Sequence, residues 1–233
     1  MKKTLLSIYF AICCCFILSC SKNGEDNKAG EIPKGAVDMG LSVYWAECNL
    51  GAETSYDYGD YYAWGETSVK SEYTLENYKF YKSGDYSNAK FTKYNSDDAK
   101  GSRYQLDKQD DAASVKLGGK WRIPTDKELS ELYEKCTWEY TTRNDIKGFE
   151  VTSSINGNSI FLPGGSLRIG DHLVEVTIGV GFYWGSAGYV PTNDPDLTSV
   201  KDIELWANFR DVSGDRTLHR RWDGLSIRPV ADK

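Results

Sequence analysis

Residues 110–140 read DDAASVKLGGKWRIPTDKELSELYEKCTWEY and hold the clearest structural signals in the chain. Acidic residues, alanines and a valine precede Gly118-Gly119, which predicts a short helix over Asp110 to Leu117 with a glycine stop. Thr125 and Glu128 have the spacing of a capping box, so a second helix is expected to begin at Thr125. Its buried face is predicted to carry Leu129, Leu132, Tyr133 and Cys136.

Around this stretch the sequence predicts short strands joined by long loops. A run of β-forming residues at 37–48 opens the domain, and two runs flank Asn156-Gly157 as the arms of a hairpin. The aromatic segment YDYGDYYAWGE (56–66) predicts an ordered loop, and residues 67–109, with few apolar anchors, predict a long surface excursion. The hairpin arms and the remaining strands are expected at 149–153, 159–162, 181–185, 205–209 and 225–230. Small antiparallel sheets with two short helices define an α+β fold.

Several segments, in this order, resemble the Fibrobacter succinogenes major paralogous domain family. They are VDMGLSVYWAECNLGA (37–52), DYGDYYAWGE (57–66), the stretch at 110–140, GNSIFLPGG (157–165), FYWGS (182–186) and GLSIRPV (224–230). The resemblance covers essentially all of residues 37–230. That family is in turn similar to the formylglycine-generating enzyme group, and it implies a C-type lectin-like fold with small twisted antiparallel sheets, two short helices and long loops.

The chain departs from these relatives at their functional positions. Formylglycine-generating enzymes use a cysteine pair late in the domain, whereas both cysteines of the domain here precede residue 137. The tripeptide with which calcium-dependent lectins hold calcium and sugar is also missing. Asn193-Asp194-Pro195-Asp196 offers oxygen ligands, but a plain turn explains it better than a calcium loop does. The resemblance therefore carries over neither a catalytic residue nor a cofactor or metal.

The N-terminus predicts an exported lipoprotein. Lys2 and Lys3 precede an apolar run that ends in Ile-Leu-Ser-Cys at Cys20, which resembles a bacterial lipobox. We expect residues 1–19 to be a signal peptide, residues 20–34 to be a flexible tether with lipidated Cys20, and residues 35–233 to form a single domain. The expected location is the outer membrane, with the domain facing the periplasm or the cell surface.

Composition narrows the class of partner. Without Lys2 and Lys3, 26 basic and 34 acidic residues leave a net charge of −8 on the mature chain. Nucleic acid is thereby disfavoured, because phosphate binding depends on a basic surface. The 16 tyrosines and 7 tryptophans are typical of saccharide or protein recognition surfaces, since their rings have flat apolar faces and polar edges. At least half of these rings are expected in the core.

The domain holds two cysteines, Cys48 and Cys136. In an oxidising compartment a disulfide between them is the simplest interpretation, and two buried free thiols are the alternative. The two histidines, His172 and His219, are far apart in sequence, and no metal-binding spacing is present.

An enzyme is the less favoured class. Asp60 and Glu66 form the best pair for a glycosidase because both belong to the aromatic loop, but hydrogen bonds that hold this loop explain them better. His219, Arg220 and Arg221 could form an anion site or, more simply, a solvated basic turn. A divergent formylglycine-type enzyme or hydrolase remains an open alternative.

A ligand-binding surface is predicted in the C-terminal third. Rings beside amide and guanidinium donors suit a sugar or a protein partner. The predicted ligand-binding residues are Tyr183, Tyr189, Asn208, Arg210, Arg220 and Trp222. Trp184 and Trp206 are expected in the core, and Arg228 is expected to form structural hydrogen bonds. The favoured function is binding of a glycan or of an envelope or host protein, and the alternative is an adhesin or accessory envelope subunit.

Overall fold

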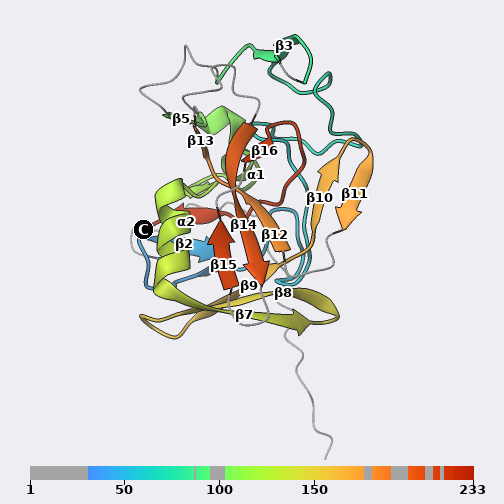
Figure 1. The fold of residues 1–233 in the computed structure, drawn as a ribbon. Coiled ribbons are helices and arrows are strands. Elements are labelled where there is room, and N and C mark those ends of the chain that lie inside the picture. Colours follow the sequence, from blue (N-terminus) through green and yellow to red (C-terminus); the bar gives the residue numbers. More distant parts are fainter. Residues whose placement is uncertain are drawn as a thin grey trace, which may run out of the picture.

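A computed structural model describes residues 31–86, 88–94, 103–175, 180–189, 199–207, 212–215 and 218–233. Two α-helices accompany short strands, and the strands pair in antiparallel ladders (Figure 1). The predicted α+β class is confirmed. The predicted signal peptide, 1–19, and residues 20–30 of the predicted tether lie outside the described residues. No described helix is long and apolar enough to cross a membrane.

Both helices begin close to where the sequence places them, but Cys136 was wrongly assigned to the second helix, because α2 ends at Lys135 and Cys136 is the first residue of β7. A 3₁₀ helix, Lys108–Asp110, leads into α1, Ala112–Leu117, whose N-cap Asp111 accepts a hydrogen bond from the Ser114 backbone. Gly118 ends α1 with φ of +68°, a conformation that favours glycine. Helix α2, Asp126–Lys135, begins with the predicted capping box between Thr125 and Glu128.

The first sheet joins the two ends of the described chain. Its order is β1 (Ala36–Val37), β2 (Val43–Ala46), β17 (Val230–Asp232) and β6 (Trp121–Arg122). The single strand predicted at 37–48 is wrong, because Gly40 turns the chain with φ of +69° while the Asp38 carboxylate accepts its N–H. The strand predicted at 225–230 is also wrong in extent, since β17 begins only at Val230.

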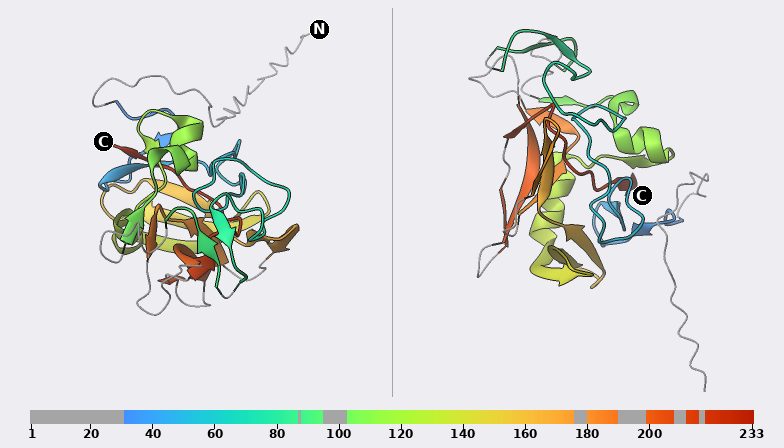
Figure 2. Two further views of the ribbon diagram at one scale, coloured as in Figure 1. Left: turned by 90° about the horizontal axis from the view of Figure 1, so that it is seen from above. Right: turned by 90° about the vertical axis from the view of Figure 1, so that its right-hand side faces the viewer.

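A second sheet contains the predicted hairpin. Its order is β7 (Cys136–Arg143), β8 (Ile146–Ser153) and β9 (Ser159–Pro163), and β8 and β9 confirm the hairpin around Asn156-Gly157. Strand β7 follows α2 directly and was not predicted. Figures 1 and 2 show this sheet at the end of the molecule opposite β3.

The remaining strands form small sheets around the long loops. A four-stranded sheet contains β12 (Val180–Trp184), β14 (Ser199–Ala207), β15 (Val212–Asp215) and β16 (Leu218–Arg220). The two-stranded sheets pair β3 (Tyr81–Ser83) with β4 (Lys90–Phe91), β5 (Arg103–Gln105) with β13 (Ala187–Tyr189), and β10 (Ser166–Ile169) with β11 (His172–Glu175). Strands β12 and β14 overlap the strands predicted at 181–185 and 205–209.

Two apolar clusters form the described core. One lies between α2, β2 and the sheet β7–β9. The other gathers rings from the long loops around Trp64, Trp184 and Trp222. Residues 67–109 supply more apolar anchors than predicted, because several of their large side chains are buried in this second cluster: Tyr73, Leu75, Tyr78, Phe80, Phe91 and Tyr94. The excursion is thus part of the core rather than a purely surface loop.

The predicted disulfide between Cys48 and Cys136 is wrong. Cys136 is a free, buried thiol at the junction of α2 and β7, where it packs in the cluster with Leu129 and Leu132. Cys48 follows β2 and lies outside this cluster. Burial raises the pKa of the Cys136 thiol to about 11, which disfavours the reactive thiolate. Cys136 therefore acts as a small apolar core residue.

Candidate binding site

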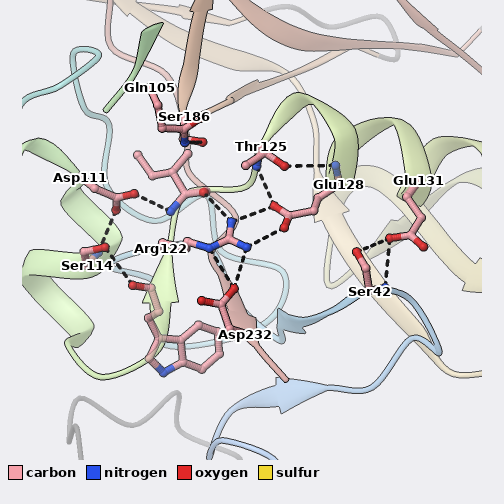
Figure 3. A network of polar contacts seen from close by, with 12 residues as sticks. Ser42, Gln105, Asp111, Ser114, Arg122, Thr125, Glu128, Glu131, Ser186 and Asp232 are labelled. Atoms are coloured by element: carbon pink, nitrogen blue, oxygen red, sulfur yellow. Dashed lines mark hydrogen bonds and ion pairs between the residues drawn. The ribbon is translucent and has the colours of Figure 1, made fainter. Parts of the chain in front are cut away.

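A polar network around Arg122 ties the helices to the first sheet (Figure 3). The guanidinium donates to both oxygens of Glu128, at 2.6 and 2.8 Å, and to Asp232 at 2.7 Å. Glu128 also accepts from the Thr125 backbone at 2.8 Å. Burial alone would raise the pKa of Glu128, but its bonds to Arg122 and Thr125 hold that pKa below the ordinary value. The bonds of Arg122 and Glu128 are thus made within the fold, and the network has a structural role.

Arg228 has the structural role that the sequence predicts. Its side chain is 1% exposed and donates to the backbone oxygens of Ala46, Glu47 and Phe161 at 2.7 to 3.0 Å. Its Nε donates to Asn49 at 2.9 Å. These bonds connect the C-terminal segment to the chain after β2 and to β9.

Two of the predicted ligand residues are buried. Tyr183 is 3% exposed and its hydroxyl donates to the Pro163 backbone oxygen at 2.5 Å, beside Asn49. Trp222 is 1% exposed and belongs to the second core cluster. Both predictions are wrong, because both rings fill the interior. Trp184 is fully buried, as predicted, and its Nε1 donates to the Tyr62 backbone oxygen at 2.7 Å.

Three further predicted residues cannot be placed as side chains. Asn208 and Arg210 lie outside the described residues, and Tyr189 is described only as the backbone partner of Arg103 in the β13–β5 pair. The side chain of Trp206 and residues 193–196, considered above for calcium, also lie outside the described part.

Arg220 is the predicted residue that reaches solvent, and it lies against Tyr86. The Arg220 guanidinium is 5.1 Å from the Tyr86 ring centre and 6.0 Å from that of Trp222. The Tyr86 ring meets Trp222 edge to face at 5.5 Å and remains 49% exposed. We call Tyr86 and Arg220, supported by Trp222, the Tyr86–Arg220 platform. The Arg220 guanidinium is held over the Tyr86 ring, and this ring rests on the buried Trp222. Both side chains are therefore already ordered, so a ligand that binds them costs little conformational entropy.

Sequence reasoning missed Tyr86. It lies in the turn between β3 and β4, where Gly84 has φ of +97°, so the signal for a turn tip was present. Nothing in the local sequence indicates that this tip meets the segment at 220–222. Only the tertiary fold brings the two together.

His219 and Asp223 flank Arg220 in the sequence. Asp223 is 3% exposed, and its Oδ1 has no hydrogen-bond partner among the described residues. Its Oδ2 is 4.0 Å from Nδ1 of His219, whose ring meets Phe182 edge to face. Burial raises the pKa of Asp223 to about 7, and the nearby charge of Arg220 opposes this rise.

Replacing Asp223 with asparagine is expected to stabilise the protein more at neutral than at mildly acidic pH. Between the ordinary pKa of 3.8 and the folded value of about 7, the unfolded chain has released a proton that the folded chain still holds. Stability therefore falls as pH rises through this window, and the amide variant lacks that loss. Melting temperatures at about pH 5 and about pH 8 measure it. An equal shift at both pH values would contradict the assignment.

The two carboxylates of the aromatic loop, Asp60 and Glu66, form hydrogen bonds and ion pairs within the fold. Asp60 accepts a hydrogen bond from the Tyr62 hydroxyl at 3.2 Å. Glu66 is buried, accepts the Lys79 N–H at 2.7 Å and pairs with Lys70 at 3.0 Å. Among the described residues, no group of three or more His, Cys, Asp or Glu side chains could hold a metal ion. These contacts favour the structural interpretation of the two carboxylates.

Comparisons with family models, curated proteins and solved structures found no match to this chain.

Proposed function

We propose that this protein is an exported lipoprotein, anchored in the outer membrane through Cys20, whose domain binds a glycan or protein ligand without chemistry of its own. The observation that carries the binding role is the Tyr86–Arg220 platform, an exposed ring and guanidinium fixed on a buried tryptophan. Such a pair offers an apolar face and several hydrogen-bond donors at one place on the surface.

The proposal includes the C-type lectin-like fold that the family resemblance implies. The short antiparallel sheets, the two short helices and the long buried loops support it. The capping box of α2 and the buried Arg228 support the correspondence of WRIPTDKEL and GLSIRPV with the family's segments.

Cys20→Ala is expected to abolish lipid attachment, because the thioether at this residue would carry the diacylglycerol. Metabolic labelling with a palmitate analogue, followed by detergent partitioning, measures the attachment. Cys15→Ala is the matched control, since this cysteine lies within the predicted signal peptide and should leave labelling intact. Label retained on the Cys20→Ala protein would show that the anchor is elsewhere or absent.

Tyr86→Ala and Arg220→Ala are each expected to weaken ligand binding by about 1 to 3 kcal/mol, the range for losing an anchoring aromatic or arginine side chain. Both side chains are exposed, so unfolding should change little. The full-length protein in detergent would be screened on arrays of glycans and of envelope proteins, and the affinity for the strongest binder would then be measured for each variant.

Arg143→Ala provides a matched control. Its side chain is 43% exposed at the end of β7 and is therefore a comparable surface arginine away from Tyr86. If Tyr86→Ala and Arg220→Ala both keep wild-type affinity, or if Arg143→Ala weakens binding equally, the platform is not the ligand-binding site.

A further inference from the structure

The β10–β11 hairpin turns a mixed polar and apolar face outward. Ser166 is opposite Glu175 and Arg168 is opposite Leu173 in the ladder, so these four side chains share one face. The other face carries Leu167 and Val174, which pack on the second core cluster. The hairpin is therefore held by its inner face and by Ser166, which is buried at 6% exposure. Its outer face is open to solvent at Arg168, Leu173 and Glu175.

Two tyrosines of the aromatic loop continue this outer face. The Tyr61 hydroxyl is hydrogen-bonded to the Ser166 hydroxyl, and the Arg168 guanidinium lies 5.8 Å from the Tyr61 ring centre. Tyr58 and Glu175 both lie close enough to Tyr61 to raise its pKa by their charges, after the larger effect of burial. We define the hairpin–tyrosine surface as Tyr58, Tyr61, Ser166, Arg168, Leu173 and Glu175.

The backbone under this surface is fixed. The Tyr58 carbonyl accepts from Nδ2 of Asn49 at 3.0 Å and from the Ser226 hydroxyl at 3.4 Å. Arg168 exchanges two backbone hydrogen bonds of 2.8 Å with Gly224. A ligand that binds here meets rings and donors that are already ordered, which lowers the entropic cost of binding.

The surface has unused bonding capacity. Leu173 is 42% exposed, Glu175 is exposed, and Tyr58, Tyr61 and Arg168 are partly exposed. Within the described ranges, the Arg168 guanidinium and the Glu175 carboxylate have no hydrogen-bond or ion-pair partner. Burial raises the pKa of Tyr58 and of Tyr61, so both phenols are neutral at physiological pH. The charges of Arg168 and Glu175 cancel, so the surface has no net charge. It offers hydrogen-bond donors on Arg168, acceptors on Glu175, and the apolar faces of the two tyrosine rings.

We propose that the hairpin–tyrosine surface binds an uncharged oligosaccharide. Sugar rings present C–H faces to phenol rings and Leu173, and their hydroxyl groups accept from Arg168 and donate to Glu175. An acidic saccharide would be attracted by Arg168 and repelled by Glu175, so it gains no net electrostatic advantage here, and the balanced charge favours an uncharged ligand. This surface is separate from the Tyr86–Arg220 platform: Figure 1 shows β3 at the top of the molecule and β10 and β11 below it. The proposal does not depend on the platform.

Biolayer interferometry with the full-length protein in detergent tests the proposal. The probes are biotinylated hexasaccharides of uncharged glucose, xylose and mannose units, with an oligogalacturonate as the acidic comparison. At least one uncharged probe is expected to bind, and Tyr58→Ala and Glu175→Gln are each expected to lower its affinity about tenfold or more. Both variants should melt like the wild type, because neither removes a core side chain.

Glu134→Gln is the matched control, because it neutralises an exposed carboxylate on α2 in place of the one on β11, and it should retain the affinity for the uncharged probe. The proposal is overturned if no uncharged probe binds, if only the oligogalacturonate binds, or if both hairpin–tyrosine variants keep wild-type affinity. Binding lost with Tyr86→Ala but kept with Tyr58→Ala and Glu175→Gln would refute this surface while supporting the platform. The two proposals can therefore fail separately.

Discussion

Arg228→Ala is expected to destabilise the protein by about 3 to 5 kcal/mol, because a large buried side chain is truncated and several buried acceptors lose their donor. The guanidinium is 1% exposed and satisfies three backbone carbonyls and the Asn49 side chain. Its removal leaves these acceptors buried without donors and opens a cavity between β9 and the chain after β2. Equilibrium unfolding in denaturant, followed by circular dichroism, measures the loss.

Two variants control this experiment. Arg220→Ala removes an exposed arginine eight residues earlier and should change the free energy of unfolding by no more than about 0.5 kcal/mol. Arg228→Lys keeps the charge but has one nitrogen in place of three, so it should recover only part of the lost stability. Burial lowers the pKa of Arg228 to about 10, which leaves it charged at neutral pH in the wild type. If Arg228→Ala unfolds like Arg220→Ala, the network is not the support described here.

Local signals predicted the helical part of the fold well. The capping box at Thr125 and the glycine after Leu117 fix helix ends through bonds within a few residues, so sequence alone carries that information. Asn156-Gly157 predicted the β8–β9 hairpin correctly for the same reason. Strand β7 was missed although its β-forming run ends in Asn144 and Asp145, both with positive φ in a tight turn. That turn signal could have revealed the strand.

The binding surfaces could be predicted only in part. Arg220 was placed correctly in solvent, whereas its ring partner Tyr86 comes from a segment more than a hundred residues earlier. The hairpin–tyrosine surface likewise combines the loop at 58–61 with a hairpin at 166–175. Such contacts depend on the tertiary arrangement of long loops, and a single sequence contains no periodicity that reports it.

Trp222 shows how charge in the local sequence can mislead. Arg220 and Arg221 precede it and Asp223 and Gly224 follow it, a pattern typical of an exposed turn. Arg221 is nevertheless fully buried, with its guanidinium 4.3 Å from the Phe91 ring centre and a donated bond of 3.0 Å to the Tyr94 carbonyl. Because the rings of the excursion surround this cation, the turn folds inward and takes Trp222 with it.

Trp222→Ala is therefore expected to cost about 3 to 5 kcal/mol, the range for truncating a large buried ring. The indole contacts Phe91 and supports Tyr86, so its loss leaves a cavity in the second core cluster and releases the platform. Trp222→Phe should retain much of the packing and lose less. Denaturant unfolding followed by circular dichroism gives the free energies, because seven tryptophans would confuse a fluorescence signal. Unfolding of Trp222→Ala at the wild-type midpoint, together with weakened ligand binding, would instead restore Trp222 as an exposed contact residue.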